Sequence, residues 1–221
     1  YLVYQLFALY SDYHFRTRLV EVAYVDSQDK NRRWQSTNFL IEDVDHMAAR
    51  YDLEEIAVPA TMRVQMDLQQ TALVEIFQYM IGNVDYSTLK SPAGEDCCHN
   101  IKLIAVEGAE EGLLPVAYDF DSTGLINAPY ATVPDSVPIK RITTRYFNGW
   151  CKERARYEQA VARVNERREE AMALFEEFSL LSKVYRSRAI KYLEKSYDRI
   201  NDEGTFERDI LKKCRGEVIK G

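Results

Sequence analysis

The polar residues best suited to chemistry lie in three short segments near the middle of the chain. Asp85 falls in a loop after an apolar segment, Asn100 stands just before a second apolar run, and Asp119 and Asp121 follow a third. Carboxylate and amide oxygens are ligands that suit Mg²⁺. Phosphoryl transfer requires a carboxylate that orients an acceptor hydroxyl and oxygens that hold a metal ion against the phosphates. The pattern therefore predicts a metal-dependent phosphoryl-transfer site, if folding brings the segments together.

Each of these segments also has an ordinary structural interpretation. Asn83 and Asp85 favour a turn, because Asn and Asp side chains bond to nearby backbone groups. Asp119 and Asp121 are placed where they can cap the end of a strand. His99 fits a structural hydrogen-bond partner better than a general base. The functional interpretation therefore depends on the order and setting of the three segments, and not on any one of them.

Four short segments resemble segments of known proteins. They are Ile81–Asp85, His99–Ile104, Leu114–Asp121 and Gly124–Ala131. The first three resemble segments of atypical kinases of the CotH spore-coat family and, more distantly, of HipA-type kinases. The fourth is similar to a stretch in uncharacterised bacterial relatives of CotH, which commonly begin with an export signal. The resemblance spans roughly residues 1–150.

The resemblance implies a role for each candidate residue. Asp85 would be the catalytic carboxylate, while Asn100 and Asp119 would bind the nucleotide through a shared metal ion. Asp121 would be a further metal ligand beside Asn100 and Asp119. The implied cofactors are ATP and Mg²⁺ or Mn²⁺, and the implied acceptor is a hydroxyl of a protein or a small molecule.

The chain also departs from the kinase pattern. Asn100 stands 15 positions after Asp85, farther than in the conventional catalytic loop, and Asp119-Phe-Asp121 lacks the glycine of the conventional motif. No glycine-rich phosphate loop or phosphate-binding lysine is recognisable. Two alternatives therefore stay open: a pseudokinase, meaning a non-catalytic binding module with a kinase-like fold, and a structural helical protein whose acidic loop residues form turns.

The elements that would position these residues follow from periodicity and turn chemistry. We expect helices over 1–12, 43–51, 67–81, 150–181, 187–200 and 205–214, and a mainly helical chain from Pro138 onward. We also expect a hairpin from strands 18–25 and 33–42 and a second hairpin from 101–106 and 113–118. This order predicts an α+β, protein-kinase-like fold. Residues 1–52 would form a partial N-lobe of a helix plus a β-hairpin, and residues 53–221 a mainly helical catalytic-lobe-like domain.

Composition narrows the classes of partner. The 221 residues are 46% hydrophobic and 29% charged, with a formal net charge of −6. An acidic chain is a poor candidate for nucleic-acid binding. No apolar run approaches the roughly 20 residues that a membrane-spanning helix needs. We therefore expect neither a nucleic-acid partner nor a transmembrane segment in this chain.

The four cysteines contain no Cys-x-x-Cys pair, which argues against a zinc site. We predict that Cys97 or Cys98 bonds Cys151 or a cysteine upstream of Tyr1, with free or buried thiols as the alternative. A disulfide favours an oxidising compartment. With the export signals of the similar proteins, it favours an extracytoplasmic location. Because Tyr1 stands in a helix with no N-cap before it, we expect further protein upstream.

Overall fold

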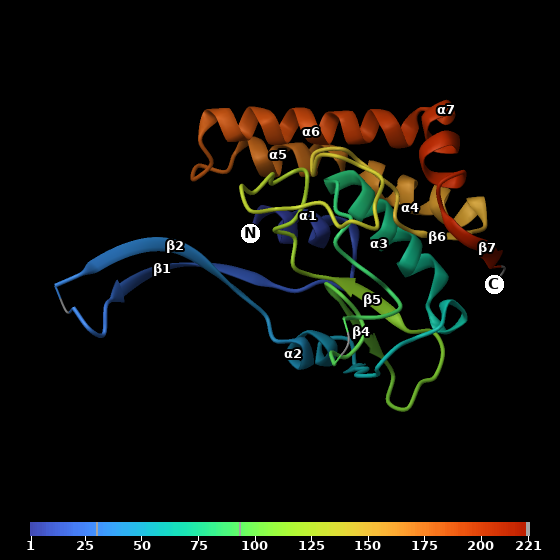
Figure 1. Cartoon of the computed structure of the whole chain (residues 1–221), viewed down its shortest axis with the longest axis horizontal. Helices are drawn as coiled ribbons and strands as arrows, with labels where there is room; N and C mark the ends of the chain where they lie inside the picture. Colours follow the sequence, from blue (N-terminus) through green and yellow to red (C-terminus); the bar gives the residue numbers. More distant parts are fainter. Residues whose placement is uncertain (30, 93, 220–221) are drawn as a thin grey trace.

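The computed structural model describes residues 1–29, 31–92 and 94–219 and shows an α+β protein with small sheets (Figure 1). The helices are α1 (Leu2–Tyr10), α2 (Val44–Ala49), α3 (Leu68–Ile81), α4 (Arg154–Glu166), α5 (Arg168–Glu176), α6 (Lys183–Asn201) and α7 (Glu203–Phe206). The strands are β1 (Thr17–Val25), β2 (Arg33–Ile41), β3 (Glu54–Glu55), β4 (Ile101–Ala105), β5 (Leu114–Ala117), β6 (Trp150–Lys152) and β7 (Arg215–Ile219). The expected α+β class is confirmed.

Helix α3 is the central element of the body, and the sequence marks both of its ends. The Asp67 carboxylate caps the start by accepting a 2.6 Å hydrogen bond from the backbone N–H of Gln70. Gly82 ends the helix in the left-handed conformation, with φ of 67°. The helix is buried from Gln70 to Ile81, because α4 and α6 pack on it from one side and β5 from the other. The helix predicted over 67–81 is confirmed.

Helix α1 belongs to the same hydrophobic core as α3. The ring of Phe7 lies 4.8 Å from the ring of Phe77, and Phe77 lies 5.6 Å from Phe120. All three side chains are at most 2% exposed. The first helix is therefore packed directly behind the segment that carries Asp119 and Asp121.

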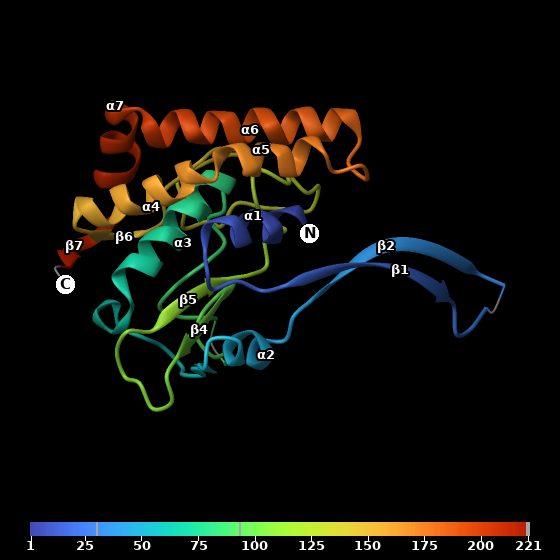
Figure 2. The same ribbon diagram turned by 180° about the vertical axis from the view of Figure 1, so that it is seen from behind.

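The first hairpin projects away from the body (Figures 1 and 2). Strands β1 and β2 pair antiparallel over their whole length, from Thr17 opposite Ile41 to Val25 opposite Arg33. The predicted hairpin over 18–25 and 33–42 is therefore confirmed. Near its tip the rings of Tyr24 and Trp34 stack with their centroids 5.0 Å apart.

A three-stranded antiparallel sheet in the order β3-β4-β5 supports the candidate residues. Ile101 at the start of β4 lies opposite Ala117 at the end of β5. The hairpin predicted over 101–106 and 113–118 is therefore confirmed. Its pairing brings the residue before β4 next to the residues that follow β5.

The C-terminal part differs from the sequence-based prediction in three places. The helix expected over 150–181 begins as strand β6 and is divided at Arg167, whose backbone leaves the helical region at φ of −109°. The segment from 138 to 149, expected to be helical, contains no helix. The helix expected over 205–214 is broken into α7 and a π-helical turn, and the chain then forms β7, which pairs parallel with β6.

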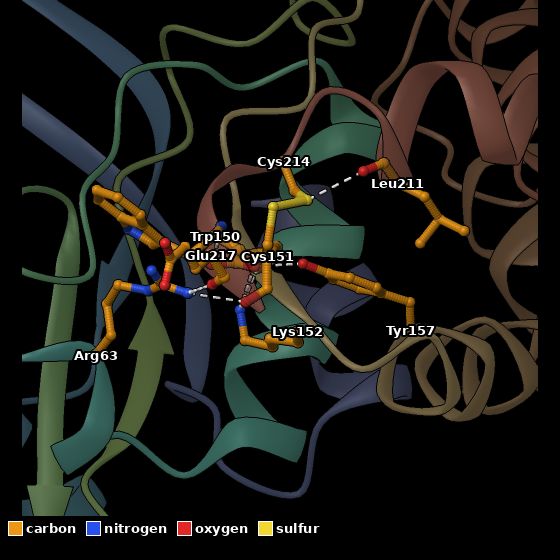
Figure 3. Close-up of a disulfide and its surroundings, with 9 residues drawn as sticks. Arg63, Trp150, Cys151, Lys152, Tyr157, Leu211, Cys214 and Glu217 are labelled. Carbon is orange, nitrogen blue, oxygen red and sulfur yellow. Dashed lines mark hydrogen bonds and ion pairs between the residues drawn. A yellow bond between two sulfur atoms is a disulfide. The ribbon is translucent and has the colours of Figure 1, made fainter. Parts of the chain in front are cut away.

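The predicted disulfide pairing is wrong. The two bonds are Cys97–Cys98 and Cys151–Cys214. Cys151 lies in β6 and Cys214 directly precedes β7, so the pairing of these strands brings their Cα atoms to 4.8 Å (Figure 3). Periodicity predicted helix for both segments, and so the proximity of Cys151 to Cys214 was missed.

Among the described residues, no helix is both long enough and apolar enough to cross a bilayer.

Candidate functional site

The turn after α3 places Asp85. The chain reverses at Gly82, and the backbone N–H of Asn83 bonds the carbonyl of Gln78 at 2.8 Å. Asn83 is 1% exposed, and its side-chain oxygen accepts a 2.8 Å hydrogen bond from the backbone N–H of Asp85. The expected turn is therefore present, and it fixes the backbone from which the Asp85 carboxylate extends.

The β4–β5 hairpin places Asn100 and Asp119 side by side at one end of its sheet. Asn100 precedes β4, and its carbonyl accepts a 3.2 Å hydrogen bond from the backbone N–H of Tyr118, the residue before Asp119. Asn100 and Asp119 both adopt positive φ, 54° and 53°. Asn and Asp tolerate this conformation better than most residues. Such backbone conformations gather at functional sites, so their presence at two candidate residues is informative.

Asp85 contacts two neighbours from the second segment. One carboxylate oxygen, Oδ1, lies 2.9 Å from Nε2 of His99. The amide of Asn100 donates to the backbone carbonyl of Asp85 at 2.7 Å and to its other carboxylate oxygen, Oδ2, at 3.3 Å. The Asp85 side chain is 31% exposed and that of His99 35%, so the contact is half-buried. Folding thus joins residues 14 and 15 positions apart in sequence.

Asp119 and Asp121 add negative charge to the same region. Partial loss of water around the Asp119 carboxyl, and then the nearby charge of Asp121, raise its pKa above the usual value, and Asp85 contributes in the same direction. The charge of Asp121 is also the main cause of the raised pKa of Tyr130, an exposed tyrosine in the following loop. The structure therefore brings Asp85 and Asn100 into direct contact and places Asp119 and Asp121 in the same acidic region, near enough to Asp85 for its charge to act on Asp119.

Tyr4 is a site residue that sequence reasoning missed. Its hydroxyl oxygen accepts a 2.9 Å hydrogen bond from the backbone N–H of Asp119, and burial raises the pKa of Tyr4 to about 12. Its ring contacts the ring of Phe120 at 4.7 Å. Phe120 thus anchors the Asp119–Asp121 segment in the core while both aspartates stay exposed. Tyr4 and Asp119 are 115 positions apart in the sequence, and no local sequence pattern indicates their contact.

The loops that carry Asp85 and Asp121 are joined by backbone hydrogen bonds. Gly124 donates to the carbonyl of Gly82 at 3.1 Å, and Leu125 donates to the carbonyl of Ile81 at 3.0 Å. Gly82 suits this position because its φ of 67° is strained for other residues, and a Cβ atom there would also require the hydroxyl of Tyr192 to move. The G-N-x-D turn and the segment after Asp121 are therefore held as one unit.

The atoms here that could bind a metal ion are oxygens: the side-chain amide oxygen of Asn100 and the carboxylate oxygens of Asp119 and Asp121. In the described part of the chain, no group of three or more His, Cys, Asp or Glu residues is placed to hold a metal ion. Two hollows in the described part of the chain lie elsewhere, one beside Trp150 and Cys151 and the other beside Arg154 and Phe206, and neither is lined by these three residues or Asp85.

No protein-family profile, no curated protein and no solved structure matches the chain.

Proposed function

We propose that the chain carries the catalytic site of an atypical kinase, which transfers a phosphoryl group from ATP to a hydroxyl of a protein or small molecule with the help of Mg²⁺ or Mn²⁺. The observation that carries the proposal is the gathering of Asp85, Asn100 and Asp119 from three separate segments. A turn or strand cap needs no such convergence. The kinase-like fold with an N-lobe-like segment over 1–52 is part of the same proposal, and so is the relation to CotH-type kinases.

In this proposal Asp85 binds the acceptor hydroxyl and accepts its proton. Its carboxylate oxygens lie 2.9 Å from His99 Nε2 and 3.3 Å from Asn100 Nδ2, and these contacts limit its rotation. A fixed carboxylate can hold an acceptor oxygen in line with a phosphoryl group, which lowers the entropic part of the barrier. His99 acts here as a positioning residue.

The donor set near Asp119 fits a hard divalent cation. Mg²⁺ in nucleotide sites takes one or two protein carboxylates and completes its shell with phosphate oxygens and water. Asn100, Asp119 and Asp121 supply oxygens of this kind. Loss of water and then the charge of Asp121 raise the pKa of Asp119, and a bound cation would offset both by stabilising the charged carboxylate. When bound, the metal and nucleotide would supply the phosphoryl group and neutralise the charge that develops on it.

The test combines calorimetry with radiolabel transfer on the full-length protein. Wild type should bind ATP in the presence of Mn²⁺ or Mg²⁺, and Asp119→Asn should abolish metal-dependent binding and transfer while staying folded. Asp85→Asn should keep most of the nucleotide affinity but lose about 100-fold or more in rate, the usual contribution of a general base. Asp135→Asn, an exposed aspartate in the proline-containing loop, is the matched control and should change neither measurement.

A specific observation favours a second candidate, a non-catalytic binding or structural module. Both carboxylate oxygens of Asp85 and its backbone carbonyl already have partners within the protein. A purely structural aspartate would show the same pattern. If wild-type protein binds no nucleotide with either metal, the enzyme proposal fails and this candidate replaces it. If Asp119→Asn binds as well as wild type, Asp121 becomes the ligand to test.

A further inference from the structure

The Cys97–Cys98 disulfide lies at the base of the turn that presents His99 and Asn100. The backbone N–H of Cys98 bonds the carbonyl of Ile101 at 3.3 Å, and the N–H of Ile101 bonds the carbonyl of Cys98 at 3.4 Å. These reciprocal bonds close the chain into a tight reversal. His99 and Asn100 form the tip of this reversal, and both contact Asp85.

The disulfide is held by the body of the protein on one side. Cys97 and Cys98 are 5% and 4% exposed. The backbone N–H of Cys97 donates to the carbonyl of Val58 at 2.7 Å, and its sulfur lies 3.8 Å from the hydroxyl of Thr61. The two cysteines therefore fix one end of the turn against the segment after β3.

The tip of the turn is paired with the loop that follows Asp85. The backbone N–H of Ser87 donates to the carbonyl of His99 at 3.0 Å, and the N–H of His99 donates to the carbonyl of Lys90 at 3.3 Å. Loosening of the turn at its base would release these two bonds together with the side-chain contacts to Asp85. The amides of Ser87 and His99 thus report directly on the site.

We propose that the Cys97–Cys98 disulfide is a positioning element of the candidate site: it holds His99 and Asn100 against Asp85, and the site is competent only in the oxidised form. The bond restricts the side-chain and backbone torsions of both cysteines at once, whereas two thiols leave them free. Reduction by a dithiol breaks the S–S bond. Each cysteine sulfur gains one electron and one proton, and the dithiol becomes a disulfide. The requirement for the oxidised form rests on the proposed function, whereas the positioning of His99 and Asn100 by the disulfide does not.

The first experiment measures amide hydrogen exchange with and without dithiothreitol. In wild type, reduction should speed the exchange of the Ser87 and His99 amides by about tenfold or more, as a local opening that leaves the core of α3 protected. Reductant also breaks Cys151–Cys214, so the variant Cys97→Ser/Cys98→Ser is measured as well. It should show the fast exchange without reductant and little further change with it. Unchanged protection of both amides in reduced wild type and in this variant would overturn the proposal.

A second variant covers the case in which Cys97→Ser/Cys98→Ser does not fold. In Cys151→Ser/Cys214→Ser the Cys97–Cys98 bond is the one disulfide left to reduce. Its Ser87 and His99 amides should respond to dithiothreitol as in wild type. If they do not respond, although mass spectrometry shows the bond to be reduced, the positioning role is wrong.

Calorimetry with MnATP then separates this inference from the proposed function. If oxidised wild type binds MnATP and loses at least about tenfold in affinity on reduction, the result supports both the proposed function and the requirement for the oxidised form. A tenfold loss corresponds to ~1.4 kcal/mol of binding free energy. If reduction leaves MnATP binding unchanged, the requirement for the oxidised form is wrong, while the proposed function stands. If oxidised wild type binds no MnATP, the proposed function fails, and the requirement for the oxidised form fails with it. The exchange experiment still decides whether the disulfide positions the turn.

Discussion

Replacement of Lys152 by methionine should strongly destabilise the protein. The Lys152 ammonium lies 2.6 Å from the Glu75 carboxylate, with side-chain exposures of 3% and 0%, and its pKa is lowered by burial. In Lys152→Met the Glu75 carboxylate keeps the 3.1 Å bond from the backbone N–H of Trp150 but loses the ammonium that pairs with it, and it remains buried from water. An uncompensated buried charge costs about 3–5 kcal/mol. That is a large part of the ~5–15 kcal/mol that separates folded from unfolded states in typical domains.

Urea denaturation at neutral pH measures this loss, and two further variants test its cause. Lys102→Met makes the same change in a pair of similar length, 2.7 Å to Glu55, whose lysine side chain is 35% exposed, and should cost at most about 1 kcal/mol. Glu75→Gln/Lys152→Met removes both charges yet keeps an acceptor for Trp150, so it should recover most of the loss. A cost below about 1 kcal/mol for Lys152→Met would refute the reasoning. A double variant as unstable as the single one would point to packing instead of charge.

Two further predictions concern stability. The Cys151–Cys214 bond spans 63 positions, and the loop-entropy relation gives about 4 kcal/mol of stabilisation for such a closure. Chemical denaturation of Cys151→Ser/Cys214→Ser should therefore show a free energy of unfolding lower by roughly that amount. An unchanged denaturation midpoint would contradict the assignment of this bond. The pKa of Asp119 is raised above 3.8 by loss of water and the charge of Asp121, so ionising Asp119 costs more in the folded than in the unfolded chain. Asp119→Asn should therefore raise the free energy of unfolding at neutral pH in the presence of a chelator. Denaturation at a series of pH values should show this gain shrinking below the folded pKa and vanishing under pH 3.8, where both states are protonated; a gain independent of pH would show that charge is not its cause.

The sequence alone determined the elements whose signals are local. The apolar face of 67–81, its Asp67 cap and its Gly82 stop specify α3, because helix formation depends on neighbours within a turn or two. The alternating runs in β1 and β2 likewise specify their pairing. Residue type also sufficed to nominate Asp85, Asn100 and Asp119, because oxygen donors next to predicted strand and helix ends are visible without coordinates.

Tertiary structure decided which of these residues meet and what holds them. Periodicity does not reveal a strand that gains its hydrogen bonds from a partner far along the chain. For this reason β6 was mistaken for the start of a helix, β7 was not predicted, and the Cys151–Cys214 bond was missed. Tyr4 bonds Asp119 across 115 positions, and that contact exists because α1 and β5 are packed against the same core. Local propensity acts over a few residues, whereas such contacts are set by the burial of apolar surface across the whole chain.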